Sequence, residues 1–249
     1  MKIDSECTIG HLPMKPLVEA IFELRWEIQA TADGLYRDPG WGLLPGLYFG
    51  KVQKDYPYNQ KLPAADLPEE LTGYSVRHRF RRAKDDWPLI QIGPGILTLN
   101  ETTKYTVWEE FRPRVMNAVE ALIDVYQGEL KPSQIELRYI NAVPYDENHW
   151  TPTEFLKERL HTTASISTDL TETNDSDLTN PSAFSLNFTV PLVEPSGKGL
   201  IAFATAKKDG EACLVWHLKV TSETSGLPDV KNKAALAHWL DSAHSIIDR

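Results

Sequence analysis

Hydrophobic and polar residues alternate most regularly in two separated stretches that share a short motif. Residues 17–28 alternate with a period of two, which predicts a strand with one apolar face and one largely charged face. The apolar face would carry Val18, Ala20, Phe22, Leu24 and Trp26, and the other face Glu19, Ile21, Glu23, Arg25 and Glu27. Residues 133–143 form the strongest strand signal in the sequence. Both stretches contain Glu-Leu-Arg followed by an aromatic residue, which suggests two related halves.

Three further strands are predicted after each of these stretches. They cover residues 74–83, 87–92 and 96–100 in the first half, and residues 183–190, 200–207 and 212–221 in the second half. Short runs rich in Gly, Pro and Asp separate them, such as Gly93-Pro94-Gly95 and Lys208-Asp209-Gly210. This spacing is typical of antiparallel meanders.

Four helices are predicted from apolar residues at helical spacing. They cover residues 43–56, 108–127 and 152–160, and a final stretch after Asp229 with its apolar stripe at Leu236, Leu240, Ala243 and Ile247. The third helix begins with Thr151 and Glu154 in a capping box. Thr106 and Glu109 fit a second capping box, and Pro113 predicts either a kink or a helix start near Phe111.

The order of these elements predicts the fold class. Strand, helix, three strands and helix follow one another twice, which predicts a duplicated α+β unit with a largely antiparallel curved sheet and two long helices packed on one face. The repeats would cover residues 1–130 and 131–249 and would be able to share one continuous sheet as a single domain. Residues 57–73 are predicted to be an extended crossover, and residues 161–182, rich in Ser, Thr, Asn and Asp, a loop with little to bury.

Composition and charge narrow the class of protein. Hydrophobic residues make up 41% and charged residues 24% of the 249 residues, as in ordinary globular proteins. We expect a cytoplasmic protein without membrane contact, because no apolar run approaches the ~20 residues of a membrane span and the first residues lack a signal-peptide core. Two cysteines, Cys7 and Cys213, predict reduced thiols rather than a disulfide framework. The net charge of -9 argues against general binding of nucleic acid.

Catalytic and nucleotide-binding motifs are not found in the sequence. Gly93-Pro94-Gly95 lacks the following helix and the lysine of a phosphate-binding loop, and neither a nucleophile elbow nor a His-Glu-x-x-His motif occurs. His238, Asp241 and His244 share the last predicted helix, but the two histidines point in well-separated directions. We therefore predict no catalytic residues, no metal site and no cofactor.

The sequence has one cluster of basic residues, formed by Arg77, Arg79, Arg81 and Arg82 and joined by Arg112 and Arg114. The first three would share a strand face, where they are suited to phosphate, RNA or an acidic partner. The alternative, which we prefer, is an edge strand that its charges protect from aggregation. Nucleic-acid binding is therefore expected only through the face of residues 77–82.

The strand 133–143 places its functional groups on two faces. Glu136 and Arg138 share one face, whereas Tyr139 and Asn141 share the other, apolar face. Asn141 would either hold a neighbouring loop or contact a ligand, because a buried amide needs a hydrogen-bond partner. The candidate ligand-binding residues, for a pocket between the sheet and the long helix, are Trp26, Arg138, Tyr139, Asn141 and Trp216.

Four short motifs, in order along almost the whole chain, resemble those of a known family. They are residues 16–26, Tyr105-x-x-Trp108-x-x-Phe111, Leu137-Arg138-Tyr139-Ile140-Asn141 and Ala243-His244-x-x-Ile247. The sequence in this respect resembles a sporadically distributed family of uncharacterised bacterial proteins of similar length. The resemblance implies the same architecture and no established activity, and the patchy distribution of the family suggests mobile or defence-related gene neighbourhoods.

Three functions follow as hypotheses. The first is a non-enzymatic binding or interaction protein, such as an accessory or regulatory component of a bacterial defence or toxin-type system, with a protein partner or a second copy of itself. The alternative is a binding protein for a nucleotide or metabolite. The last is a nuclease or phosphodiesterase that uses carboxylates such as Glu23, Glu101 and Glu136.

Overall fold

Nine strands form one antiparallel sheet in the computed structural model, which describes residues 16–30, 35–68, 72–102, 107–164, 183–208 and 210–248. Their order across the sheet is β4-β5-β6-β7-β1-β8-β11-β10-β9. The strands are β1 (Leu17–Trp26), β4 (Tyr58–Lys61), β5 (His78–Arg81), β6 (Leu89–Gly93), β7 (Ile96–Glu101), β8 (Pro132–Pro144), β9 (Ser185–Leu192), β10 (Gly197–Lys208) and β11 (Glu211–Glu223). Two short strands, β2 (Gln29–Ala30) and β3 (Tyr36–Arg37), pair separately. The predicted α+β class with a large antiparallel sheet is confirmed.

All eight predicted strands occur, and the differences lie near β5. The strand begins at His78 rather than at residue 74, because Tyr74 has a left-handed backbone with φ 61°. The unpredicted strand β4 pairs with β5. The preferred interpretation of the arginine-rich strand as a sheet edge is therefore wrong, because β4 occupies that edge.

Four α-helices are present in the part of the chain that the structure describes. They are α1 (Leu44–Val52), α2 (Trp108–Val125), α3 (Pro152–Leu160) and α5 (Lys233–Ile247). The capping box of α3 is confirmed, since Glu154 N donates to Thr151 Oγ1 at 3.3 Å and Thr151 N donates to Glu154 Oε2 at 2.9 Å. Helix α2 begins at Trp108 and contains Pro113, so the later of the two predicted starts is wrong. Thr106 and residues 165–182 lie outside the described residues.

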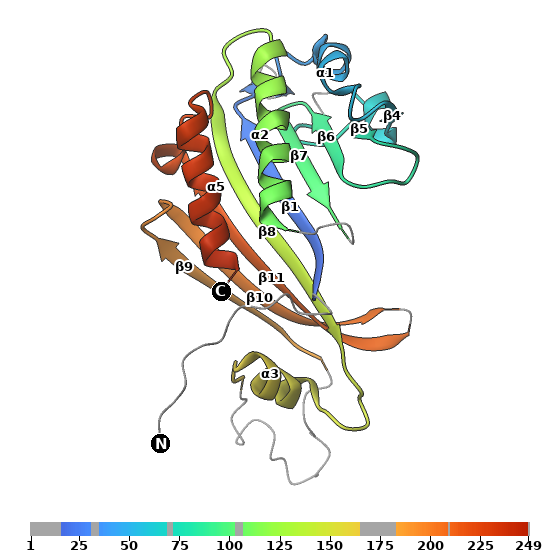
Figure 1. Ribbon diagram of the computed structural model, residues 1–249, viewed down its shortest axis with the longest axis vertical. Helices are drawn as coiled ribbons and strands as arrows, with labels where there is room; N and C mark the ends of the chain where they lie inside the picture. Colours follow the sequence, from blue (N-terminus) through green and yellow to red (C-terminus); the bar gives the residue numbers. More distant parts are fainter. Residues whose placement is uncertain are drawn as a thin grey trace.

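Helices α2 and α5 lie side by side over one face of the sheet (Figure 1). Their apolar stripes meet Ala20, Phe22, Leu24 and Trp26 of β1, which are fully buried. Val18, predicted on the same face, is instead 38% exposed. The buried stripe of α5 is the predicted one, at Leu236, Leu240, Ala243 and Ile247. Each fully buried large apolar side chain contributes about 1.5–3 kcal/mol, so this layer is the main source of stability. A second cluster, which includes Phe155, Phe203 and Leu214, packs α3 against the far end of the long strands.

The carboxylate of Asp38 connects four segments beneath α2. Its Oδ2 accepts hydrogen bonds from Trp26 Nε1 and from Gly95 N, both at 2.9 Å. Its Oδ1 accepts from Tyr126 Oη at 2.6 Å and from Gly40 N at 3.0 Å. Asp38 is only 2% exposed, and burial beside it raises the pKa of Tyr126, so the tyrosine hydroxyl stays a donor. One side chain thereby joins the end of β1, the β6–β7 turn and the end of α2.

We predict that Asp38→Asn lowers the free energy of unfolding by about 2–4 kcal/mol, because an amide nitrogen would face donors that now share a carboxylate. Denaturant unfolding measures the change. Asp124→Asn is the matched control, since it removes an exposed ion pair to Lys51 and should cost less than about 1 kcal/mol. Equal stability of the two variants would contradict the role of Asp38 as a connector of these segments.

Candidate functional site

The candidate ligand-binding residues lie at separate places in the fold. Trp26 is buried under Asp38, whereas Tyr139 Oη lies 3.0 Å from His244 Nδ1 on α5. Tyr139 pairs with Ala20 and Trp26 with Pro132, so the two aromatic residues are about 20 Å apart along the strands. Asn141 and Trp216 are brought together, because they stand opposite each other on β8 and β11.

The surroundings of Tyr139 and Trp26 are filled by internal contacts. The ring of His244 stacks on Trp108 with a centroid distance of 4.1 Å, and burial lowers the pKa of His244. Neutral His244 can accept the Tyr139 hydroxyl hydrogen bond. These side chains therefore hold α5 to α2 and to the sheet.

The arginines of residues 77–82 are mostly engaged within the protein. Arg77 and Arg81 are 5% and 8% exposed, and their guanidinium groups lie over the rings of Trp41 and Trp87. Arg79 Nε donates to Gln91 Oε1 at 2.6 Å, and Arg82 is exposed. Arg112 and Arg114, in turn, pair with carboxylates of α5, β7 and α2. Few guanidinium groups of this basic cluster therefore remain available to bind phosphate.

Two of the three candidate carboxylates lie on one face of the sheet and the third on the other. Glu101 is 1% exposed on the helix side, where Arg114 Nη1 donates to its two oxygens at 2.6 and 2.7 Å. Burial raises the pKa of Glu101, and the ion pair with Arg114 opposes that shift. Glu23 and Glu136 lie on the opposite face. The three carboxylates therefore do not form one cluster.

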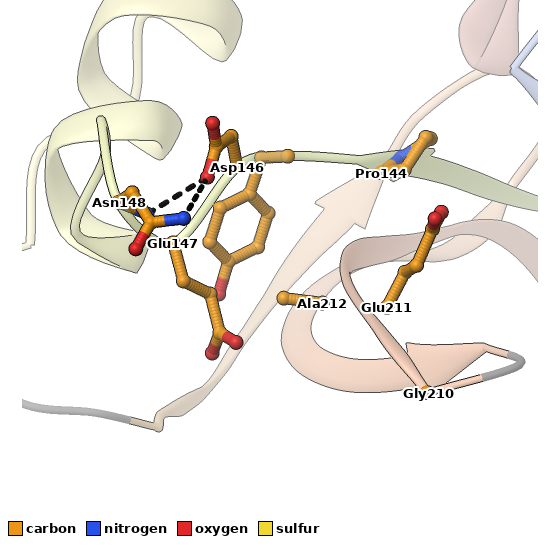
Figure 2. Close-up of a pocket in the computed structure, with 8 residues that line it drawn as sticks. Pro144, Asp146, Glu147, Asn148, Gly210, Glu211 and Ala212 are labelled. Carbon is orange, nitrogen blue, oxygen red and sulfur yellow. Dashed lines mark hydrogen bonds between the residues drawn. The ribbon is translucent and has the colours of Figure 1, made fainter.

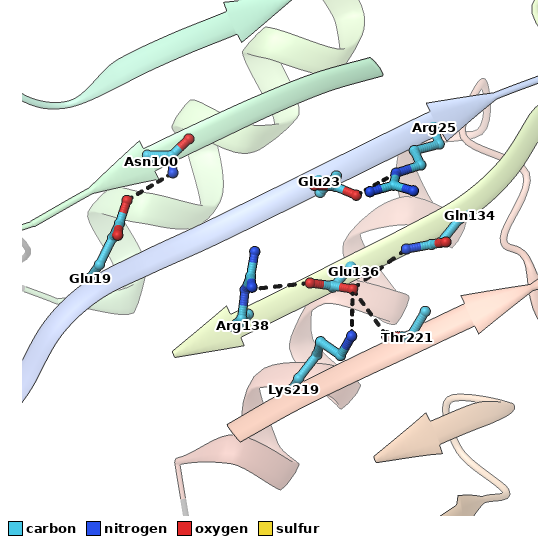
Figure 3. A network of polar contacts seen from close by, with 9 residues as sticks. All are labelled: Glu19, Glu23, Arg25, Asn100, Gln134, Glu136, Arg138, Lys219 and Thr221. Atoms are coloured by element: carbon cyan, nitrogen blue, oxygen red, sulfur yellow. Dashed lines mark hydrogen bonds and ion pairs between the residues drawn. The ribbon is translucent and has the colours of Figure 1, made fainter. Parts of the chain in front are cut away.

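The face of the sheet opposite α2 and α5, which we call the open face, carries a polar network (Figure 3). Its centre is the β1–β8 pair, where Glu23 stands directly opposite Glu136. Arg25 Nε donates to Glu23 Oε1 at 2.6 Å. Like charges directly opposite each other are destabilising, so the neighbouring cations are needed to offset the repulsion.

Among the described residues of the open face, Glu136 has the most side-chain partners. Lys219 Nζ lies 3.1 Å and Thr221 Oγ1 lies 3.3 Å from its Oε2, so β11 supplies two of its partners. Arg138 Nε lies 3.4 Å from its Oε1, and Gln134 Nε2 lies 3.4 Å from Oε2. The Glu136 side chain is 6% exposed, whereas those of Arg138 and Lys219 are 31% and 29% exposed. The carboxylate is buried beneath cations that still reach solvent.

A hollow of about 440 Å³ opens over this network. Its lining includes the basic residues Arg25, Arg138, Lys198 and Lys219 and the acidic residues Glu23, Glu136 and Glu223. Four cations against three anions give a local surplus of one positive charge, in a chain whose net charge is -9. Lys198 is exposed and has no ion-pair partner among the described residues. The hollow is thus a cationic spot on an acidic protein.

The polar network continues from β1 toward β5. Glu19 Oε1 accepts from Asn100 Nδ2 at 2.8 Å, and Gln91 Nε2 donates to Asn100 Oδ1 at 3.2 Å. Gln91 in turn accepts the hydrogen bond of Arg79. Polar side chains thereby connect four neighbouring strands on this face.

The period of a strand predicts that Glu136 and Arg138 share one face, but it does not predict Lys219 and Thr221 as partners of Glu136. The alternation within residues 212–221 does put Lys219 and Thr221 on a common face. Their register against β8 depends on pairings between distant segments, which the local pattern does not reveal.

A second hollow, of about 420 Å³, lies between the β8–α3 connection and the β10–β11 hairpin (Figure 2). Asp146 Oδ1 accepts from Asn148 N at 2.9 Å and Oδ2 lies 2.6 Å from His149 Nδ1. These bonds, led by the one from Asn148 N, lower the pKa of Asp146. Glu147 and Glu211 point away from each other, so the carboxylates of this hollow do not converge.

On α5, His238 contacts a different residue from Asp241 and His244, which both contact Trp108. His238 Nε2 lies 3.3 Å from Glu194, and Asp241 pairs with Arg112, while His244 stacks on Trp108. Among the described residues, no group of three or more His, Cys, Asp or Glu side chains is arranged to hold a metal ion. Within the same residues, no helix combines the length and the apolar character of a membrane span.

Comparison of the chain with protein-family models, curated proteins and solved structures found no significant match.

We predict that Glu136→Gln lowers the free energy of unfolding by about 1–2 kcal/mol, because Arg138 and Lys219 lose their shared counter-charge. Relief of the repulsion from Glu23 offsets part of this loss. Glu23→Gln is the matched control and should cost less than about 1 kcal/mol, since its partner Arg25 is 37% exposed. Urea titration of both variants tests the order, and a more stable Glu136→Gln protein would show that repulsion dominates the pair.

Proposed function

We propose that this protein is a non-enzymatic binding protein and that the open face of its sheet is the surface that contacts the partner. The single observation that carries the proposal is the hollow over Glu136, where cations with partly exposed side chains surround a buried carboxylate. The opposite face is covered by α2 and α5, so it presents helix surfaces rather than the sheet.

The cations of the open face are suited to form ion pairs with acidic groups of a partner. Arg138 and Lys219 share Glu136, which leaves each with unused donors, and Lys198 is exposed. An acidic segment laid across the hollow would meet a surplus of positive charge. Complementary charge of this kind favours rapid association and the correct orientation of the partner.

The position of Glu101 favours binding over the nuclease or phosphodiesterase alternative. That mechanism needs carboxylates that converge on one reacting group or metal. Glu101 is paired with Arg114 on the helix side, and Glu136 is surrounded by cations on the other side. Both carboxylates are therefore neutralised by the protein itself.

Binding of a small anionic molecule is the second candidate function. The volume of the hollow falls within the range of about 300–1,000 Å³ that is usual for ligand sites, although most such sites are more apolar. In this candidate function the ligand would bind on the open face, and not in the pocket between the sheet and the long helix that the sequence predicts.

The chain is also proposed to be a duplication of one strand–helix–three strands–helix unit. The sheet order supports this, because β7, β6 and β5 follow β1 on one side as β11, β10 and β9 follow β8 on the other. The two Glu-Leu-Arg motifs add support, since Glu23 and Glu136 are directly paired and would lie on a local two-fold axis. The resemblance to a bacterial family suggests an accessory role in a defence or toxin-type system.

Capture of partners from a lysate of the source cells tests the binding face. We expect the double variant Arg138→Glu, Lys219→Glu to recover at least about tenfold less of a partner that the wild-type protein captures, because two cations of the open face become anions. A tenfold loss corresponds to only about 1.4 kcal/mol of binding free energy. The matched control is Lys51→Glu, Lys233→Glu, which reverses two exposed lysines of the helix layer and should keep the partner.

The outcomes separate the two candidate functions. Loss of the partner with the control variant and its retention with the open-face variant would contradict the proposal. A small-ligand protein would instead gain melting temperature with a phosphate- or carboxylate-bearing compound, and the open-face variant would lose that gain.

A further inference from the structure

Strand β9 forms one edge of the sheet, and among the described residues its one edge-protecting feature is Pro191, near the end of the strand. It pairs with β10 over eight consecutive positions without a register shift. Residues 183–193 contain no charged side chain. Phe188 and Val190 are 46% and 39% exposed, although both are large and apolar. Natural proteins normally protect a long edge strand with several charges, prolines, bulges or a covering segment.

The backbone of β9 presents unpaired hydrogen-bonding groups away from β10. Thr205 N donates to Phe184 O at 3.2 Å, which identifies residues 184 and 205 as a hydrogen-bonded pair. Because such pairs alternate along antiparallel strands, Phe188 and Val190 bond to β10, and the N–H and C=O groups of Ser185, Asn187 and Thr189 point outward. These outward groups have no backbone partner in the described part of the chain.

The opposite edge of the sheet differs in length and in charge. Strand β4 has only four residues and ends at Lys61, which pairs with Asp66. A 3-10 helix, Pro63–Asp66, follows it directly. The β4 edge is therefore short and charged, whereas the β9 edge is long and uncharged.

We propose that β9 is a homodimer interface, in which it pairs antiparallel with β9 of a second copy of this chain. A second copy fits because the strand carries no charge, so identical strands meet without repulsion. A two-fold pair also satisfies the outward backbone groups of β9 in both copies at once, and the assembly ends at the dimer. A head-to-tail contact would leave the β9 edge of one copy unpaired. The exposed Phe188 and Val190 side chains would gain apolar contacts on one side of the joined sheet.

The pairing would join the two open faces. The two-fold axis of an antiparallel pair is perpendicular to the sheet, so both hollows would open on the same side of one continuous sheet. Thr189 lines the hollow and belongs to β9, so the hollows would adjoin the interface. The dimer does not depend on what the open face binds, and it can be tested separately.

Sedimentation velocity of the full chain over about 0.1–100 µM tests the proposal. The wild type should approach twice the chain mass of 28.2 kDa as its concentration rises. Asn187→Pro should weaken association at least about tenfold, because it removes an outward N–H that β10 does not use. Asn187→Ala is the matched control, since it keeps the backbone donor and should associate like the wild type.

A second variant covers the case in which proline disturbs folding. Phe188→Lys places a charge on an already exposed side chain and should also give the monomer, with a far-ultraviolet circular dichroism spectrum like that of the wild type. A wild type that sediments as the monomer at every concentration overturns the proposal. So does a dimer that persists in both Asn187→Pro and Phe188→Lys, because its interface must then lie elsewhere.

Discussion

The pairing of β1 with β8 is the constraint on which the rest of the structure depends. It joins the strands of the first half of the chain to those of the second half, and it sets Glu23 directly opposite Glu136. A shift of one residue would exchange the two faces of a strand, turning buried Phe22 and Leu24 toward solvent. The same register brings Arg25, Arg138 and Lys219 around the two carboxylates, so core packing and open-face electrostatics have one cause.

Local patterns in the sequence predicted much of this fold. Alternation located the strands, and the capping box at Thr151 and Glu154 located the start of α3, because both signals lie within a few neighbouring residues. The separation of Glu136 from Tyr139 onto two faces followed from the period of a strand. Strand β4 was missed because residues 58–61 are polar and do not alternate, and its place at the edge corrected the interpretation of β5. The role of Asp38 and the approach of Lys219 to Glu136 depend on contacts between distant segments.

The two faces of the sheet differ in how their polar groups are engaged. The helix face is closed by α2 and α5, and its polar groups, such as those of Asp38 and Tyr139, bond within the protein. The open face keeps its cations partly exposed over a buried Glu136, which suits it to a partner that brings negative charge. Pairing of two β9 strands would double that surface without changing its chemistry.

The most direct measurement of binding at the open face is lysine labelling read by mass spectrometry, with and without the captured partner. Lys198 and Lys219 report on the open face, and Lys51 and Lys233, which are exposed on the helix layer, report on the other side. We expect the partner to reduce labelling of Lys198 and Lys219 and to leave Lys51 and Lys233 unchanged. Protection of Lys51 and Lys233 with continued labelling of Lys198 and Lys219 would contradict binding at the open face.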